Sequence, residues 1–412
     1  MNIQKNQIFT VKITDMGIDG EGIGHLEDSG ALSGNGYTLF VKDAVLGDTV
    51  RAKVVKPKKG YAFARLEEVL EPSPDRVEPV CAYARQCGGC QLQAVSYEKQ
   101  LAFKDRKVKN NLIRIGGFAP DFVEEIMEAP VGMEHPFHYR NKAQFPVGMD
   151  KNGRLIAGFY AGRTHTIIEN RDCALGVAEN KIVLDIVLDF CTEKKIPAYD
   201  ETTGKGLLRH VLIRKGFSTG QIMVCLILNG SSFAAEQELA DRLFEKVPGM
   251  TSFSVNSNTE RTNVIMGSKT RTIRGKDRIE DTIGGLVFTI SPQSFYQVNP
   301  VQTEKLYQTA LDFADLQGDE RVWDLYCGIG TISLFLAKAV PNGQVTGVEI
   351  VPEAIENAKK NAALNGISNT SFYCGAAEDV VTDMVAKRRT PSKEDTNGAL
   401  ADVVVVDPPR KG

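Results

Sequence analysis

The chain has 412 residues and a mass of 45.1 kDa, a length typical of about two or three domains. Its composition, 42% hydrophobic and 25% charged, excludes collagen-like, coiled-coil and disordered proteins. The formal net charge is −3, from 49 Lys and Arg against 52 Asp and Glu, so the overall charge does not favour a nucleic-acid partner. There is no apolar run long enough to span a membrane, and the N-terminus lacks the apolar core of a signal peptide. We expect a cytoplasmic protein with no membrane contact, and a monomer by default.

Residues 1–70 predict a small β module. Apolar residues alternate in FTVKIT, glycines interrupt GIDGEGIGHLEDSG, and YTLFVKDAVLGDTVRAKVV and YAFARLEEVL supply further strands. Short strands separated by glycine turns are typical of a five-stranded OB-like barrel, a fold that often binds oligonucleotides. Four aromatic residues could stack bases on this barrel: Tyr37, Phe40, Tyr61 and Phe63. The proline-rich segment 71–79 is predicted to be a linker.

Residues 71–290 predict a central α+β domain. Helices are expected at 97–115, 178–195 and 233–247, a β-meander at 138–168, and a hairpin at 206–229. From residue 303 helices alternate with short apolar strands, which indicates a parallel α/β sheet of Rossmann type. The strands are expected at 321–326, 344–350, 370–375 and 401–410, with a polar loop at 386–399. A doubly wound sheet would need more strands, so residues 291–412 predict an incomplete C-terminal domain.

Three runs of basic residues indicate a polyanion partner. A solvated face explains any single run, but three runs together favour nucleic acid. The runs are Arg51, Lys53, Lys56, Lys58, Lys59 and Arg65; Lys99, Lys104, Arg106, Lys107, Lys109 and Arg114; and Arg261, Lys269, Arg271, Arg274, Lys276 and Arg278.

A candidate cofactor site follows the first strand of the predicted α/β sheet. In the segment 324–331, DLYCGIGT, the two glycines let the backbone approach a ligand, and the helix that follows favours negative charge at its N-terminus. The third glycine of a dinucleotide fingerprint is missing. Glu349 ends the next strand, where an acid can accept both ribose hydroxyls of an adenosyl group, so the pattern favours S-adenosylmethionine over NAD. Asp407 lies at the end of the last strand and at the same edge of the sheet, where a carboxylate can face both the methyl donor and a base.

Three of the eight cysteines lie close together in the sequence and indicate a metal centre. Five residues separate Cys81 from Cys87 and two separate Cys87 from Cys90, with Cys173 as the expected fourth ligand. Four thiolates suit zinc or an iron–sulfur cluster, although structural zinc usually prefers two CxxC-like pairs. A radical enzyme would need a CxxxCxxC spacing, which this segment lacks. The scattered cysteines, such as Cys225, are expected to be buried.

These features together resemble the RNA (uracil-5-)-methyltransferase family, and most closely its branch that methylates 23S ribosomal RNA. The resemblance rests on the barrel, the four cysteines, SPQSFYQVNP at 291–300, DLYCGIGT at 324–331 and DPPRKG at 407–412, and it spans the whole chain. It implies an N-terminal TRAM domain, a 4Fe-4S cluster on the four cysteines, and a C-terminal methyltransferase domain. It also implies that Gln297, Tyr326, Glu349 and Asp407 bind S-adenosylmethionine, with Gln297 and Asp407 also near the uracil. The tRNA-modifying branch generally lacks both the TRAM domain and the cluster, but a tRNA substrate stays open.

In this family a cysteine thiolate adds to C6 of uracil, C5 takes the methyl group, and a glutamate removes the C5 proton. That cysteine and glutamate lie after the DPPR motif, so we expect them beyond Gly412 and expect this chain alone to be inactive. A non-catalytic RNA-binding or assembly protein is therefore the alternative. A flipped base is implied, since a stacked uracil could not reach the pocket. The expected RNA contacts are Arg140, Asn141, Lys142, Phe145, Arg209, His210 and Arg214.

Overall fold

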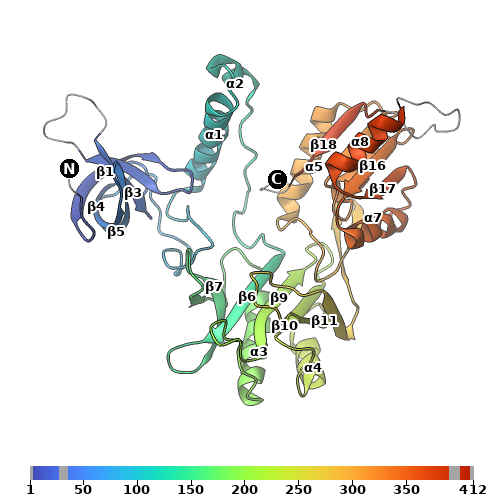
Figure 1. Ribbon diagram of the computed structural model, residues 1–412, viewed down its shortest axis with the longest axis horizontal. Helices are drawn as coiled ribbons and strands as arrows, with labels where there is room; N and C mark the ends of the chain where they lie inside the picture. The colour runs from blue at the N-terminus through green and yellow to red at the C-terminus, as the bar shows by residue number, and fades with distance from the viewer. Residues whose placement is uncertain (1–2, 27–35, 389–399, 409–412) are drawn as a thin grey trace. The chain divides into compact units, whose positions relative to one another are not determined.

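The computed structural model describes residues 3–26, 36–388 and 400–408 (Figure 1). Two compact units are present: residues 1–136 with 158–174, and residues 137–157 with 175–412. Among the described residues, none of the helices combines the length and the apolar character that a membrane span requires. The boundaries expected at residues 70 and 290 stay predictions.

The first unit begins with a closed β-barrel, as the sequence predicts. Its strands are β1 (Ile8–Met16), β2 (Gly22–Leu26), β3 (Tyr37–Lys42), β4 (Thr49–Pro57) and β5 (Tyr61–Glu71). The order around the barrel is β1-β2-β3-β5-β4, and only β3 and β5 are parallel neighbours. Alternate side chains fill the interior; on β4 these are Val50, Ala52 and Val54, all fully buried. Closure leaves no unpaired strand edge in the barrel.

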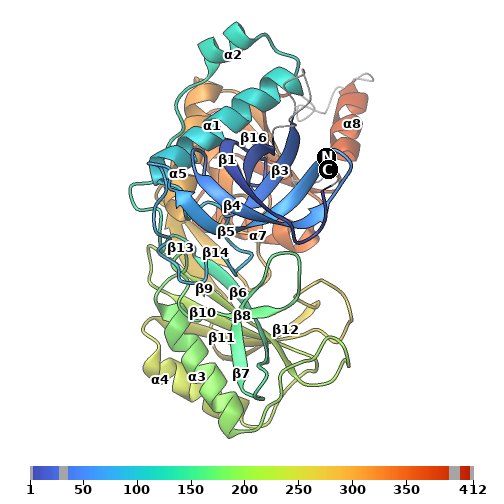
Figure 2. The same cartoon turned by 90° about the vertical axis from the view of Figure 1, so that its left-hand side faces the viewer.

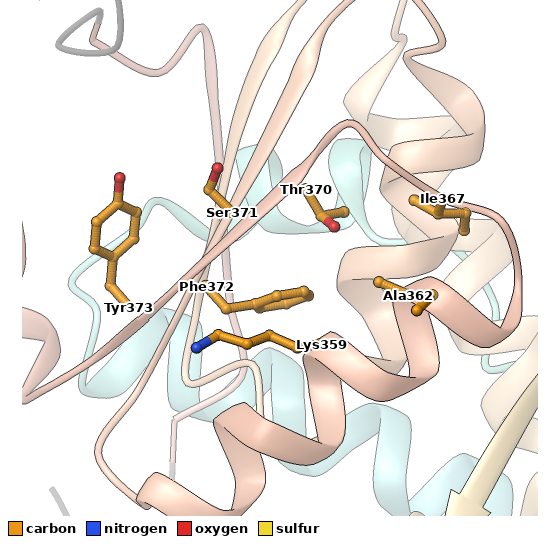
Figure 3. A pocket seen from close by; sticks show the side chains of 8 residues that line it. Lys359, Ala362, Ile367, Thr370, Ser371, Phe372 and Tyr373 are labelled. Atoms are coloured by element: carbon orange, nitrogen blue, oxygen red, sulfur yellow. The ribbon is translucent and has the colours of Figure 1, made fainter.

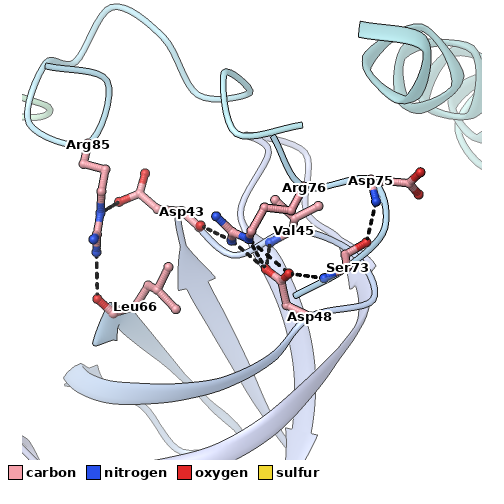
Figure 4. A network of polar contacts seen from close by, with 8 residues as sticks. All are labelled: Asp43, Val45, Asp48, Leu66, Ser73, Asp75, Arg76 and Arg85. Atoms are coloured by element: carbon pink, nitrogen blue, oxygen red, sulfur yellow. Dashed lines mark hydrogen bonds and ion pairs between the residues drawn. The ribbon is translucent and has the colours of Figure 1, made fainter. Parts of the chain in front are cut away.

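The proline-rich segment 71–79 is fixed to the barrel rather than free. Arg76 donates hydrogen bonds to both carboxylate oxygens of Asp48, the closest at 2.6 Å, and to the Asp43 carbonyl at 2.9 Å (Figure 4). The backbone N–H of Ser73 donates to the same carboxylate at 2.8 Å. Burial raises the pKa of Asp48, but these hydrogen bonds outweigh it and lower the pKa overall. The expected linker is thus anchored through one buried carboxylate.

The rest of the first unit holds α1 (Tyr97–Arg114), α2 (Pro120–Ile126) and β8 (Ile167–Glu169). The basic helix α1 lies against the barrel: Arg106 pairs with Asp15 at 3.3 Å, and Lys107 donates to the Ile18 carbonyl at 3.0 Å. No residue of α1 is fully buried, so its basic face is available to solvent.

The second unit contains most of a seven-stranded sheet, of order β12-β11-β10-β9-β6-β7-β8. Its further strands are β6 (Lys142–Met149), β7 (Leu155–Tyr160), β9 (Leu208–Lys215), β10 (Ile222–Leu228), β11 (Met250–Ser257) and β12 (Lys269–Gly275). The helices α3 (Glu179–Glu193) and α4 (Glu236–Lys246) lie side by side on one face of the sheet (Figure 2). Every residue of β10 is buried, which confirms the buried position predicted for Cys225.

A hairpin and a parallel α/β sheet complete this unit. The elements are β13 (Ile279–Ile283), β14 (Leu286–Ile290), α5 (Pro300–Ala314), β15 (Arg321–Leu325), α6 (Thr331–Ala339), β16 (Gln344–Glu349), α7 (Pro352–Leu364), β17 (Thr370–Cys374), α8 (Ala377–Arg388) and β18 (Val403–Val406). The strand order is β17-β16-β15-β18, and all the pairs are parallel (Figure 1). Val322 on β15, Val345 on β16 and Leu336 on α6 form a buried core between sheet and helices.

The fold class predicted from the sequence is confirmed: a five-stranded barrel, a mixed α+β region and a parallel α/β sheet. The predicted meander, the hairpin at 206–229 and the helices α1, α3, α4, α5, α6 and α7 are present. The sequence interpretation missed α2, α8 and the strands β11 to β14. Most of the loop expected at 386–399 and residues 409–412 of the DPPRKG motif lie outside the described residues.

Candidate functional site

The glycine-rich loop between β15 and α6 is built on two left-handed glycines. Gly328 and Gly330 have φ values of 56° and 82°, which side-chain-bearing residues rarely adopt. A Cβ on Gly330 would lie 3.1 Å from the Cβ of Ala358, so this glycine also permits the close approach of α7. The loop therefore turns tightly and presents the N-terminus of α6 at the carboxyl edge of the sheet, where open α/β proteins bind ligands.

Glu349, at the end of β16, is held in place by two backbone donors. Its Oε2 accepts from the Gly328 N–H at 3.1 Å, and its Oε1 accepts from the Val351 N–H at 2.9 Å. Each carboxylate oxygen keeps further acceptor capacity, because an ionised carboxylate has about four lone-pair sites. The sequence-predicted acid is thus directly joined to the glycine loop and oriented to accept hydroxyl groups.

Asp324 lies beneath the loop and is fully buried. Its pKa is raised to about 7, mainly by burial and to a smaller extent by the nearby carboxylates Asp407 and Glu349, although the Ser333 hydroxyl donates a hydrogen bond to its Oδ2. Its Oδ1 has no hydrogen-bond partner in the structure. A buried oxygen without a donor is costly, so this atom is suited to a ligand that brings an N–H group.

The structure brings Gln297 and Asp407 together although 110 positions separate them. The Gln297 amide donates to Asp407 Oδ2 at 3.3 Å, and Asn141 donates to the Gln297 carbonyl at 2.9 Å. Asp407 directly follows β18, next to β15 in the sheet, so the pair lies at the edge that carries the glycine loop. Tyr326, with φ 72°, begins that loop and is 39% exposed. The structure therefore gathers the four predicted cofactor residues at one edge of the sheet.

The four clustered cysteines come together within the first unit. Burial raises the pKa of Cys87, and the thiols of Cys173 and Cys81 raise it further; Cys90 is affected in the same way. A Cβ on Gly88 would lie 2.9 Å from backbone atoms of Gly162 and Tyr160, so only glycine fits at that position. Within the described part of the chain, no three His, Cys, Asp or Glu side chains converge as ligands of a single metal ion.

Several basic and aromatic residues expected to contact RNA are buried instead. Phe145, Arg209, His210 and Arg214 are all less than 8% exposed. Arg209 donates to the carbonyls of Asn258 and Glu260 and stacks on Tyr199, and burial lowers the pKa of His210 to about 4. The expectation was wrong for these four residues and for Asn141, which is 3% exposed, because segments distant in sequence lie over β6 and β9.

The three basic runs differ in the structure. In the third run, Arg271 pairs with Glu236 at 2.9 Å and Arg274 pairs with Asp241, so α4 neutralises much of its charge. In the first run, Lys53 and Lys56 on β4 and Lys59 in the turn before β5 have no described ion pair. Three of the predicted stacking aromatics, Phe40, Tyr61 and Phe63, form one cluster with ring centroids 5.6 to 5.7 Å apart.

A separate pocket of about 480 Å³ opens between α7 and the edge strand β17 (Figure 3). Phe372 and Lys359 lie next to each other in it, whereas Tyr373 points away on the opposite side of the strand. None of the four predicted cofactor residues lines this pocket, so it is distinct from the glycine-loop site.

Comparison with known proteins identifies the family of this chain. The family model described as "TRAM domain" matches residues 4–66, and the family model described as "Methyltransferase domain" matches residues 316–403. Over 410 residues the chain is 44% identical to a Clostridium tetani protein and 47% identical to a Halalkalibacterium halodurans protein, both named as uncharacterized RNA methyltransferases. Each alignment covers 100% of this chain and 84% of the relative. The chain belongs to the RNA methyltransferase family.

A solved structure has the same fold as this methyltransferase. The crystal structure of the Pyrococcus abyssi tRNA (uracil-54, C5)-methyltransferase, in complex with S-adenosyl-L-homocysteine, superposes with a TM-score of 0.70. It covers 98% of this chain and 84% of the other, at 24% sequence identity. In the present chain, the barrel corresponds to the matched TRAM domain. The glycine loop, Glu349 and β15 to β17 of this chain lie within the matched methyltransferase domain.

Proposed function

We propose that this methyltransferase serves the transfer of a methyl group from S-adenosylmethionine to C5 of a uridine in RNA, with 23S ribosomal RNA as the substrate. The observation that carries the proposal is the contact between Gln297 and Asp407 at the edge that holds the glycine loop. An amide and a carboxylate side by side offer one donor and one acceptor. The uracil edge has the complementary pair, an acceptor at O4 and a donor at N3.

The residues at the loop fit S-adenosylmethionine. The cofactor is cationic at its sulfonium and ammonium groups and supplies an electrophilic methyl group when bound. The carboxylates of Asp407 and Glu349 contribute to the raised pKa of Asp324, and a cation between the three groups would relieve that repulsion. Glu349 would accept hydrogen bonds from the ribose hydroxyls, and Oδ1 of Asp324, which has no partner in the structure, would accept one from the ammonium group.

The described cysteines near the loop do not suit the role of nucleophile. Cys327 is buried, and burial raises its pKa far above neutrality, so its thiolate form is rare. We propose that a cysteine thiolate adds to C6, that C5 then takes the methyl group, and that a carboxylate removes the C5 proton before the thiolate leaves; Cys327 is not this thiolate. S-adenosylhomocysteine is then released.

We further propose that Cys81, Cys87, Cys90 and Cys173 hold a 4Fe-4S cluster. The thiols of Cys81 and Cys173 raise the pKa of Cys87 and of Cys90, which supports a shared site in which one cationic centre would stabilise the thiolates. Tetrahedral zinc would hold its thiolates roughly 3.8 Å apart, from Zn–S bonds of about 2.3 Å. Among the described residues no three such side chains meet at one ion position, so the spacing of the cysteines along the sequence is what supports the cluster over zinc.

Cofactor binding by the 412-residue chain tests the first part. We expect isothermal titration to show binding of S-adenosylhomocysteine, and Glu349→Gln to weaken it by about tenfold to a hundredfold, because hydrogen bonds to a charged group are worth roughly 1.5–3 kcal/mol. Glu353→Gln, which changes an exposed acid of the same unit, is the matched control. Equal affinity in the Glu349 variant would contradict the assigned site.

Methyl transfer tests the second part. The reading frame after codon 412 should be sequenced from genomic DNA and the longer chain expressed beside this one. We expect the longer chain to place 5-methyluridine in unmodified 23S RNA through a covalent enzyme–RNA adduct, and this chain to bind cofactor without turnover. A stop codon directly after Gly412, or methylation at another atom, would overturn the proposal. The stop codon would favour the RNA-binding alternative.

A further inference from the structure

Three cations lie on or just before two adjacent strands of the second unit, close to the segment that supplies Gln297. Lys142 on β6 is the cross-strand partner of Arg214 on β9, and Arg140 precedes Lys142 by two positions. The guanidinium of Arg214 is buried and donates to the carbonyls of Pro292, at 3.3 Å, and Ser294. Its Nε has no partner. Arg140, Lys142 and Arg214 are called the cation triad below.

No carboxylate neutralises the cation triad. Within the described ranges no ion pair involves any of its three members. Lys215, the residue after Arg214, pairs with Glu179 at 2.6 Å. Burial lowers the pKa of Lys142 to about 8, and the two groups that add to this effect, Arg214 and Arg140, are both cations. Like charges brought together and partly buried are unfavourable unless an anion joins them.

The cation triad is next to the proposed uracil-binding pair. Asn141, between Arg140 and Lys142, donates its side-chain amide to the Gln297 carbonyl at 2.9 Å and its backbone N–H to the Val298 carbonyl at 3.0 Å. Arg214 holds the start of the same segment through Pro292 and Ser294. An anion bound by the triad would therefore lie beside the residues that face the target base. Lys142 and Arg140 are only partly buried and can reach it, whereas Arg214 is fully enclosed.

We propose that Arg140 and Lys142 form a phosphate site for the RNA backbone next to the target uridine, with the buried Arg214 strengthening the field. The inference rests on the proposed function and adds to it the residues that position the substrate strand. A phosphate fits because its oxygens accept hydrogen bonds from both side chains and its charge compensates the triad.

Salt-dependent binding of the 412-residue chain to a labelled ten-nucleotide oligouridylate tests the proposal. We expect Lys142→Gln to weaken binding about tenfold at low salt, as loss of one charge-assisted contact. We also expect the slope of log affinity against log salt to fall by about 0.7, the value for one phosphate contact on a single strand. Lys151→Gln, at the exposed turn between β6 and β7, should leave both quantities unchanged. An abasic oligomer of the same length should show the same loss of slope, because the site binds phosphate rather than base.

The protonation state of Lys142 gives a second test, the pH dependence of RNA affinity, which would not change if Lys142 had a purely structural role. RNA phosphate would hold Lys142 protonated, so wild-type affinity should fall as the pH rises above about 8. Lys142→Arg keeps its charge at these pH values, and we expect it to bind at least as well as wild type without that pH dependence.

Two results would separate failure of this inference from failure of the proposed function. If Lys142→Gln keeps the wild-type slope while wild type binds RNA, the phosphate site is wrong and the function stands. If wild type binds S-adenosylhomocysteine but no RNA at low salt, both the phosphate site and the RNA substrate are wrong.

Discussion

The four clustered cysteines of the first unit and the carboxylates at the edge of the α/β sheet are both groups of acidic side chains, but they differ in how the protein accommodates them. Burial and neighbouring thiols raise the pKa of Cys87 and Cys90 above their usual range, so these side chains are neutral at pH 7. Glu349 and Asp407 receive hydrogen bonds from backbone N–H groups and from the Gln297 amide. The thiol site therefore acquires its charge only with a ligand, whereas the carboxylate site is already prepared for one.

This difference indicates which site depends more on its ligand. Neutral thiols need few donors, and Cys87 receives one from the Gly89 N–H at 3.4 Å. Metal binding to thiols releases protons and adds its free energy to folding, so a thiol site without metal is less stable than one with it. The carboxylate site is held by its own hydrogen bonds, and we expect it to keep its geometry without cofactor.

The largest expected effect is loss of the proposed cluster when one of the four cysteines is replaced. Serine at any one of Cys81, Cys87, Cys90 or Cys173 should abolish visible absorption and acid-labile sulfide in anaerobically purified protein, because a hydroxyl is a poor ligand for iron. Thermal unfolding should occur at a lower temperature in these variants, since metal binding contributes to folding. The measurements are the iron and sulfide content and the unfolding midpoint.

Cys374→Ser is the matched control, because Cys374 is an exposed thiol outside the group. It should keep iron, sulfide and the wild-type unfolding midpoint. If wild type contained stoichiometric zinc and no sulfide, the four cysteines would form a zinc site and not a 4Fe-4S cluster. Wild type without any metal, purified anaerobically, would show that the thiols are a metal-free packing group.

A smaller effect is expected when the buried acid of the carboxylate site is made neutral. The pKa of Asp324, about 7, is above its unfolded value of 3.8, so the folded protein binds the proton more tightly. Stability is then fully present below the unfolded pKa and falls as the pH rises toward 7. A shift of this size corresponds to about 4 kcal/mol at most. Asp324→Asn should therefore flatten the fall in unfolding free energy between pH 5 and 8, measured by urea denaturation.

The neutral variant should also separate stability from binding. We expect Asp324→Asn to lose affinity for S-adenosylhomocysteine while it gains stability at alkaline pH, because the amide cannot accept at both former oxygens. Asp319→Asn, at an exposed acid before β15, should change neither quantity. An unchanged pH profile in Asp324→Asn would show that Asp324 is ionised normally in the folded state.

The sequence signals that point to these two sites are local. Strand, glycine pair, helix and strand follow one another from 321 to 349, and three cysteines lie within ten positions. Periodicity also predicts most helices and the barrel. Helix α8 was missed because its apolar residues follow the helical period weakly, in AEDVVTDMVAKR.

Long-range burial and pairing could not be predicted in the same way. Polar residues along β9 suggest a solvent-facing strand, yet backbone segments near Asn258 and Pro292 cover Arg209 and Arg214. The acids that neutralise Arg271 and Arg274 lie 35 and 33 positions earlier, on α4. The contact between Gln297 and Asp407 likewise depends on how β18 enters the sheet. These facts belong to tertiary packing, which spacing along the chain does not reveal.

The smallest effect concerns the glycine loop that prepares the carboxylate site. Gly328→Ala should cost about 1–2 kcal/mol of unfolding free energy, because a residue with a Cβ is strained at φ 56°. It should also weaken S-adenosylhomocysteine several-fold, since the Gly328 N–H orients Glu349. Gly366→Ala carries the same strain at φ 65°, at the end of α7 with open space around it, and should lose stability but not affinity. If both variants lost the same affinity, the loop would affect binding only through overall stability. The carboxylate site would then not be held ready for its ligand, and it would not differ in this respect from the cysteine site.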